Sequence, residues 1–239
     1  MKLLKLCFTA AHVQATEPLV ADLSDHLIAI TTGFTGAKVV MFGAIEDEGD
    51  VVVTVRGPPT DVRVREKSRI AGVWMNRDSL KFRNTPAFYS VASSDQKLER
   101  VPEVIRGRHE IGVEHLRLAP DEAADEEEVA QFTEALRRRK IASGVWLREI
   151  EPVNFLGPRL FRTALEFPSN VPTGTYSISV LLVRDNAVVS AQTTPLVISK
   201  TGVGAEVFTF AFRQAALYGL LAITLAISAG WGAALIFRR

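Results

Sequence analysis

The sequence predicts a mainly β protein: two immunoglobulin-like antiparallel β-sandwich modules with an intervening helix, followed by one transmembrane helix. Three observations lead to this fold class. Segments of alternating apolar and polar residues recur between Gly/Pro turns in both halves of the chain. One central segment has helical periodicity, and an uncharged run near the C-terminus is long enough to cross a bilayer. The expected divisions are a signal peptide (1–15), an N-terminal β-sandwich region (16–119), a helical connector (120–144), a C-terminal β-sandwich region (145–200), a juxtamembrane segment (201–216) and the transmembrane helix (217–237). This pattern leaves open whether the two sandwich regions form one composite domain.

The N-terminal region contains short strand patterns separated by turn residues. Residues 37–45 form an apolar run, and Val51, Val53 and Val55 share one face of the next segment. Proline cannot continue a strand ladder, so residues 57–59 (GPP) predict a break after that strand. Short strands at this spacing favour an antiparallel sandwich.

A helix is predicted over residues 122–142. Val129, Phe132 and Leu136 recur at helical spacing, and Gly144 is a plausible stop. Acidic residues lie in the first half of this segment and basic residues in its last turns, and both placements suit the helix dipole.

The C-terminal region returns to alternation with period two, followed by a turn at Asp185 and Asn186. A strand, a Pro-x-Gly turn, a second strand and a hairpin follow one another as in immunoglobulin-like sandwiches. The apolar positions of the two alternating faces are Phe161, Leu165, Phe167, Tyr176, Ile178, Val180 and Leu182.

The two ends of the chain predict where the protein lies. Residues 217–237 carry no charge, and about 21 helical residues span roughly 31 Å, the thickness of a bilayer core. Residues 1–15 resemble a signal peptide with a cleavage site after Ala15, although a late start codon would also explain this segment. Arg238 and Arg239 favour a cytoplasmic C-terminus. We therefore expect a single-pass inner-membrane protein with its N-terminal domain in the periplasm.

Composition excludes several classes of function. The formal net charge is +1, so bulk charge gives no reason to expect a nucleic-acid partner. The only cysteine, Cys7, lies in the predicted signal peptide. The mature chain would then have no disulfide, no cysteine-ligated metal and no thiol nucleophile. No cofactor motif is found.

Catalytic constellations are weak. Ser24, Asp25 and His26 are the residue types of a hydrolase triad, but neighbours on a strand point to opposite faces and cannot converge. Ser94 and Lys97 match a Ser-x-x-Lys pair without the remaining motifs of penicillin-recognising acyltransferases. We expect a protein that is not an enzyme and has no catalytic, metal or cofactor residues.

Two other patterns suggest contact surfaces. Residues 67–94 interleave basic and aromatic side chains, which could bind an anionic ligand, a sugar or a lipid head group. The favoured interpretation is a core segment in which the aromatic rings pack and the cations are solvated. The candidate ligand or partner surface consists of Lys67, Arg69, Trp74, Asn76, Phe88 and Tyr89. In the membrane helix, small residues recur every four positions and would let a second helix approach closely, including that of a homodimer. The candidate helix–helix interface consists of Ala222, Ala226, Gly230 and Ala234.

The chain as a whole resembles a known family, the alphaproteobacterial "putative transmembrane protein" family. The resemblance is carried by residues 33–37 (GFTGA), 56–58 (RGP), 71–76 (AGVWMN), 87–91 (AFYSV), 160–162 (LFR), 171–176 (VPTGTY), 218–220 (YGL), 230–231 (GW) and 237–239 (FRR). It implies a membrane-anchored, periplasm-facing protein whose relatives are often encoded beside a sulfite-exporter-like permease. It supplies no catalytic residues.

These observations lead to two main hypotheses of function. The first is a membrane-anchored periplasmic accessory or interaction module, with an inner-membrane transporter or another membrane protein as its partner. The alternative is a periplasmic ligand-binding or sensor module that uses the segment from Trp74 to Tyr89. An exported hydrolase is a third hypothesis, which the residues favour least. A pocket with convergent polar groups would favour the second, and an exposed apolar patch the first.

Overall fold

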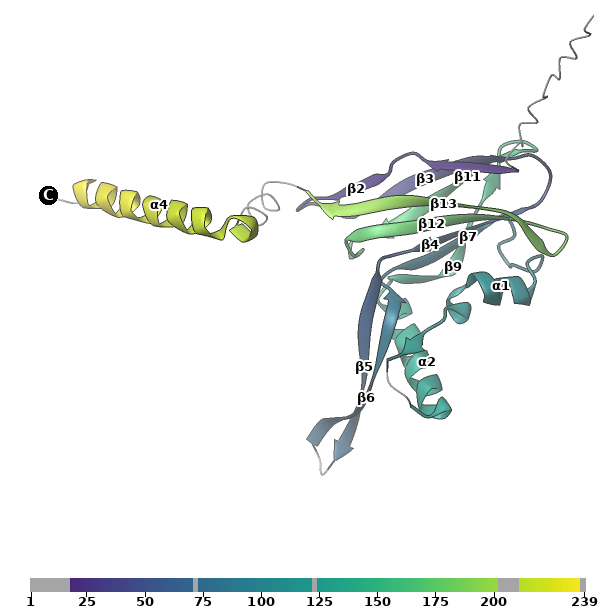
Figure 1. The fold of residues 1–239 in the computed structure, drawn as a ribbon, viewed down its shortest axis with the longest axis horizontal. Coiled ribbons are helices and arrows are strands. Elements are labelled where there is room, and N and C mark those ends of the chain that lie inside the picture. The colour runs from purple at the N-terminus through teal and green to yellow at the C-terminus, as the bar shows by residue number, and fades with distance from the viewer. Residues whose placement is uncertain (1–17, 71–72, 122–123, 202–210, 237–239) are drawn as a thin grey trace, which may run out of the picture.

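The computed structural model describes residues 18–70, 73–121, 124–201 and 211–236. Two β-sheets stack as a sandwich, a long hairpin extends from it beside a helix, and a C-terminal helix is drawn apart from both (Figure 1). The predicted mainly β fold with a C-terminal apolar helix is confirmed. The four-stranded sheet has the order β1 (Leu19–Leu23), β3 (Gly36–Ile45), β11 (Leu160–Pro168), β10 (Asn154–Phe155). The six-stranded sheet has the order β2 (Leu27–Ile30), β13 (Ala187–Lys200), β12 (Gly174–Arg184), β4 (Asp50–Arg56), β7 (Tyr89–Ser93), β9 (Trp146–Pro152).

Both sheets contain strands from both halves of the chain. β3 pairs with β11, and β4 pairs with β12, each antiparallel over seven residues or more. The expected division into two separate sandwiches is therefore not confirmed, because strands assigned to the two regions share the same sheets. One sandwich buries the apolar faces of both regions against each other.

Aromatic rings fill the space between the sheets. Phe88 lies 5.4 Å from Phe167 of β11 and 5.9 Å from Tyr176 of β12, measured between ring centroids. The Tyr176 hydroxyl donates a hydrogen bond of 2.6 Å to the carbonyl oxygen of Pro172, four residues earlier. A tyrosine bonded back to the nearby main chain also recurs at the strand corners of immunoglobulin-type sandwiches.

The other face of the six-stranded sheet is covered as well. Residues around α1 (Glu103–His109) and the short 3₁₀ helix η1 (Val113–His115) pack on it and bury Ile105, Ile111 and Val113. Consequently β4 is buried on both faces, which explains its almost continuous run of valines.

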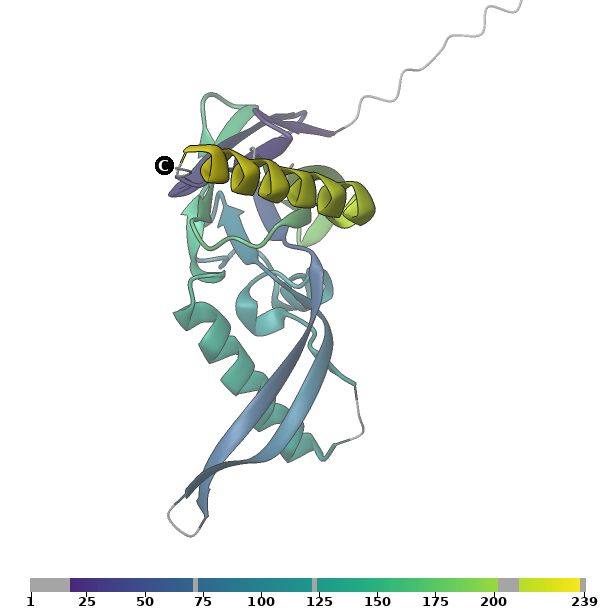
Figure 2. The same ribbon diagram turned by 90° about the vertical axis from the view of Figure 1, so that its left-hand side faces the viewer.

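A second, smaller core lies outside the sandwich. The strands β5 (Pro59–Ile70), β6 (Val73–Pro86) and β8 (Ala119–Pro120) form a three-stranded sheet, against which α2 (Glu126–Ala142) packs (Figure 2). Phe132 and Leu136 of α2 are buried against Leu80 and Phe82 of β6. The predicted apolar face of the helix is thus confirmed, although the helix begins later than expected, at Glu126.

The C-terminal helix α4 (Ala215–Ile236) contains one window, Ala215–Ala233, that is long and apolar enough to cross a membrane. None of that window is buried against the rest of the chain. The predicted signal peptide, the segment 202–210 and the terminal residues 237–239 lie outside the described residues.

Candidate functional site

The β5–β6 hairpin carries four of the six residues in the predicted ligand surface. In the strand register, Arg69 is opposite Trp74 and Lys67 is opposite Asn76. Basic positions on β5 therefore adjoin an indole position and an amide position on β6. The side chains of residues 67–78 lie outside the described residues, so this pairing is known from the backbone alone.

Phe88 and Tyr89 do not join this surface. Both side chains are buried, Phe88 among the aromatic rings of the sandwich and Tyr89 against the segment after α1. The prediction that Phe88 and Tyr89 belong to the ligand surface is therefore wrong, because residues 87–93 turn from the hairpin back into the core. An alternation of aromatic and basic residues is equally compatible with core packing, and here packing accounts for both rings.

An ion cluster fixes the base of the hairpin to β8. The Lys81 ammonium lies 2.8 Å from the Asp61 carboxylate and 3.2 Å from that of Asp121, which also pairs with Arg83. The hydrogen bond from Lys81 holds the pKa of Asp61 below its usual value. Partial desolvation would raise the pKa of Asp121, but the hydrogen bonds from Arg83 and Lys81 outweigh it and lower that pKa. The cluster is therefore a fully charged brace at neutral pH.

A cavity of about 140 Å³ lies between the α1–η1 segment and strands β7 and β9. Its polar wall includes Arg106, whose Nε is buried without a hydrogen-bond partner among the described residues. His115 lies 3.5 Å from the Glu103 carboxylate, and Arg148 donates hydrogen bonds to Glu114. Burial would raise the pKa of Glu114, but the bonds from Arg148 keep it lowered. The lining residues are Val91, Lys97, Leu98, Arg106, Ile111, Gly112, Val113, Glu114, His115, Leu147, Arg148 and Ile150. No spacing in the sequence indicated this cavity, because its walls come from four separate elements.

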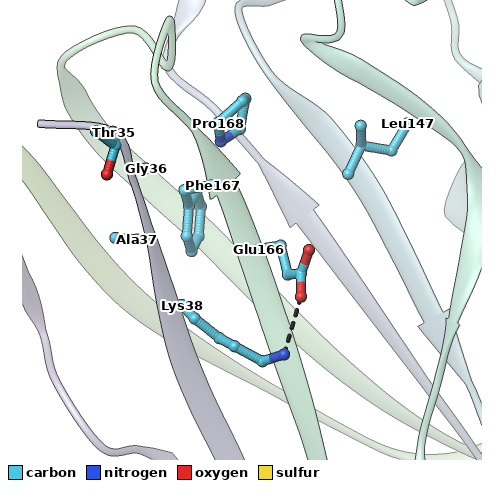
Figure 3. Close-up of a pocket in the computed structure, with 8 residues that line it drawn as sticks. All are labelled: Thr35, Gly36, Ala37, Lys38, Leu147, Glu166, Phe167 and Pro168. Atoms are coloured by element: carbon cyan, nitrogen blue, oxygen red, sulfur yellow. Dashed lines mark hydrogen bonds and ion pairs between the residues drawn. The ribbon is translucent and has the colours of Figure 1, made fainter.

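A wider, open groove of about 470 Å³ lies at the start of β3 (Figure 3). The pair of Lys38 and Glu166, 2.9 Å apart on neighbouring strands, lines it together with the ring of Phe167. Gly36 at its rim has φ = 125°, and a Cβ there would lie 2.9 Å from the Phe167 carbonyl oxygen. The groove thus depends on Gly36. The two charged residues that line it, Lys38 and Glu166, already pair with each other.

The weak catalytic constellations do not assemble among the described residues. The Ser24 hydroxyl donates to Asp25, while His26 pairs instead with Asp22 at 3.1 Å. The Ser94 hydroxyl is bonded to the Asp50 carboxylate and to a main-chain amide of β4. Within the described part of the chain, no group of three or more His, Cys, Asp or Glu residues could hold a metal ion.

The small-residue stripe lies on α4, as expected for positions four residues apart. Ala222, Ala226 and Gly230 are exposed in the chain as described, and a Cβ added at Gly230 would meet nothing within 4 Å. Ala234 lies in the last turn of α4, and its side chain is outside the described residues. The role of the stripe as a helix–helix interface stays a prediction.

A folded β-rich body joined to one apolar helix defines a membrane-anchored, single-pass protein. Residues 18–239 match the family model described as "Putative transmembrane protein (Alph_Pro_TM)", and the chain belongs to this family. The resemblance inferred from the sequence motifs is thereby confirmed.

Other comparisons add little. No curated protein matches the chain. A chain from the solved structure "Structural basis of T cell specificity and activation by the bacterial superantigen toxic shock syndrome toxin-1" is similar over 77% of this chain and 99% of its own length. The identity is 8% and the TM-score 0.27, and a similarity at that level carries no argument about fold or function.

Proposed function

We propose that this protein is a periplasm-facing accessory module that binds an inner-membrane transporter and is held beside it by α4. The proposed role is interaction without catalysis. Export of the folded body is supported by the signal-like residues 1–15 and by the basic C-terminal pair Arg238 and Arg239.

The observation that carries the proposal is the β5–β6 hairpin. Its strands stay paired as far as Ile70 and Val73. Among the residues whose side chains are described, the second core reaches outward along it as far as Val64 and Leu80. Beyond that point the hairpin is a two-stranded ribbon (Figure 2). A two-stranded ribbon is marginally stable by itself, so a partner that covers this one would stabilise it.

The composition of this ribbon also suits a protein partner. It places Arg69, Trp74 and Met75 close together in the strand register. Tryptophan, arginine and methionine are enriched at protein interfaces. A membrane-bound partner would meet the hairpin at high effective concentration, because α4 confines both proteins to one surface.

Cross-linked co-purification from native membranes tests the proposal. In a shortened variant, residues 66–78 are replaced by Asn-Gly, a two-residue turn that suits the paired positions Arg65 and Ser79. This leaves Val64 and Leu80 in the second core, so the fold should persist. We expect a transporter to co-purify with the wild-type chain and to be lost from the shortened variant. Equal recovery of that transporter from both chains would contradict the role of the hairpin, and the absence of any membrane partner would contradict the proposal itself.

A periplasmic ligand-binding or sensor function is the alternative. The cavity beside Arg106 is a better candidate for its binding site than the segment from Trp74 to Tyr89. The unpartnered Arg106 Nε is a donor that a small polar ligand could satisfy. Mass spectrometry of the purified chain distinguishes the two functions. A small molecule lost in Arg106→Gln but kept in the shortened variant would support ligand binding.

A further inference from the structure

The outer face of the four-stranded sheet exposes large apolar side chains on three neighbouring strands, β1, β3 and β11. Val20 of β1 is 53% exposed, Phe42 of β3 46% and Leu160 of β11 47%. Among the described residues no helix covers this face, unlike the outer face of the six-stranded sheet. Apolar residues grouped on a sheet face indicate an interaction surface.

The strand register arranges these side chains in rows that cross the sheet. One row consists of Val20, Ala44 and Leu160, and the next of Asp22, Phe42 and Arg162. The second row therefore has an acid on β1, a ring on β3 and a base on β11. The row is therefore negative on β1 and positive on β11, on either side of the central strand β3.

Both charged side chains can still form hydrogen bonds or ion pairs with a partner. No ion pair or hydrogen bond of the Arg162 side chain is found within the part of the chain that the structure describes. Asp22 pairs with His26 and accepts a hydrogen bond from the Leu23 amide through Oδ1, and no hydrogen bond or ion pair of its Oδ2 is found among the described residues. An exposed, unpaired arginine beside an apolar ring is a favourable interface residue.

We propose that this face forms a homodimer with a second copy of the chain, around a two-fold axis roughly parallel to β3. Such an axis exchanges the two sides of the sheet, so Asp22 faces the partner's Arg162 and Val20 faces the partner's Leu160. Phe42 faces the partner's Phe42. The rows are thus self-complementary in both charge and apolarity, as an isologous interface requires.

The axis also agrees with the membrane anchor. β13 ends at Lys200 and β2 runs parallel to it, so both strands end on the side from which the chain continues to α4 (Figure 1). The strands of the sandwich lie close to one direction, because stacked sheets align to within about 30°. An axis along β3 therefore points toward the bilayer, and both copies can insert α4 in the same membrane.

The dimer depends on that anchoring. Three strand spacings of about 4.8 Å and ten residues at about 3.3 Å give a face of roughly 500 Å². A stable interface buries about 800 Å² per partner. We therefore expect the dimer in the membrane, where tethering raises the effective concentration, and not in dilute solution.

Cross-linking of the full chain in membrane vesicles tests the arrangement. In a Cys7→Ser background, Phe42→Cys places one thiol close to the axis, and Val189→Cys places a thiol of similar exposure on β13 of the other sheet. With a short thiol–thiol cross-linker, Phe42→Cys should give a product of twice the chain mass in several-fold higher yield than Val189→Cys. Equal yields would overturn the proposal, as would a Phe42→Cys product that contains a different protein.

Charge reversal tests the facing of the two rows. Asp22→Arg or Arg162→Asp in the Phe42→Cys chain should reduce the dimeric product about fivefold or more, because like charges then oppose each other twice. The double variant Asp22→Arg/Arg162→Asp should restore it. Both residues are exposed on a sheet surface, so the fold should tolerate all three variants. Failure of the double variant to restore the dimeric product would overturn the proposed axis. This outcome does not depend on whether the protein also binds a transporter.

Discussion

Tyr89 shows how one side chain joins two layers of the protein. Its hydroxyl donates a hydrogen bond of 2.6 Å to the Glu110 carbonyl oxygen and accepts one of 2.9 Å from the Gly112 amide. Both partners lie in the turn after α1, where Glu110 has φ = 54°. Burial raises the pKa of Tyr89, so the phenol stays protonated and can donate throughout the physiological range.

We expect Tyr89→Phe to lower the free energy of unfolding by about 1–3 kcal/mol, because a carbonyl and an amide would lose their buried partner. Urea unfolding of the fragment 16–200 measures this loss. Val20→Ala, at an exposed position, is the matched control and should change stability by about 0.5 kcal/mol or less. Equal unfolding midpoints for Tyr89→Phe and the wild-type fragment would show that the turn is held by other contacts.

Tyr89 and Phe88 also show where residue-level prediction fails. Their sequence neighbourhood is basic and aromatic, and such a pattern suits either an interface or a core. The strand order decides between interface and core, because the chain enters β7 at Tyr89 and buries both Phe88 and Tyr89 in the core. No local pattern contains the strand order, so the sequence alone could not separate these two residues from Trp74 and Lys67.

At the scale of elements, the β5–β6 hairpin packs against α2 and is braced by charges to Asp121 at the end of β8. Stability from the lowered pKa values of Asp61 and Asp121 is present above their ordinary pKa of 3.8 and is lost as the pH falls through the lowered values. Protonation would neutralise both carboxylates that Lys81 contacts. We therefore expect this unit to loosen in acid before the sandwich does.

Hydrogen exchange measures that order of events. After correction for the intrinsic rates, α2 amides should lose protection as the pH falls below about 4, while β4 amides keep theirs. Asp61→Asn with Asp121→Asn should weaken α2 at neutral pH and remove most of its pH dependence. Parallel loss of protection in α2 and β4 would contradict an independent acid-sensitive unit.

The helix α4 gives a prediction of its own. If Ala226 and Gly230 face another helix, Gly230→Leu should obstruct close packing but leave insertion intact, because leucine is more hydrophobic than glycine. The variant should reach the membrane normally and lose its co-purifying partner. Leu221, about half a turn around the helix from Gly230, provides the control variant Leu221→Ala. Unchanged partner recovery from Gly230→Leu would leave α4 as an anchor only.

Local elements were predictable where one face of each is apolar. The helix with Phe132 and Leu136 on its buried side and the alternating strand β12 follow directly from periodicity. The pairing of β3 with β11 joins residues that are more than a hundred positions apart. Such pairing depends on the global packing of two sheets, for which the sequence of either strand holds no signal. The sequence therefore could not predict that both halves of the chain share one sandwich. It also could not predict the cavity between the α1–η1 segment and strands β7 and β9.

At the scale of the whole molecule, strands from both halves of the chain share the two sheets of one sandwich. We expect residues 16–200, expressed without α4, to be soluble and β-rich, because both sheets and both cores end before residue 201 among the described residues. Circular dichroism and sedimentation check this. The fragment should also sediment as a monomer at low concentration, because the proposed dimer needs the tether. A helical spectrum or an aggregated product would contradict a fold that is independent of the anchor.

The central claim is that this body is held outside the cytoplasm by one C-terminal helix. A reporter that is active only in the periplasm tests it most directly, when fused either close after Lys200 or after Arg239. We predict activity for the first fusion and none for the second, because the one candidate span found among the described residues lies between the two positions. Activity after Arg239, or inactivity after Lys200, would contradict the topology on which the proposed partnership rests.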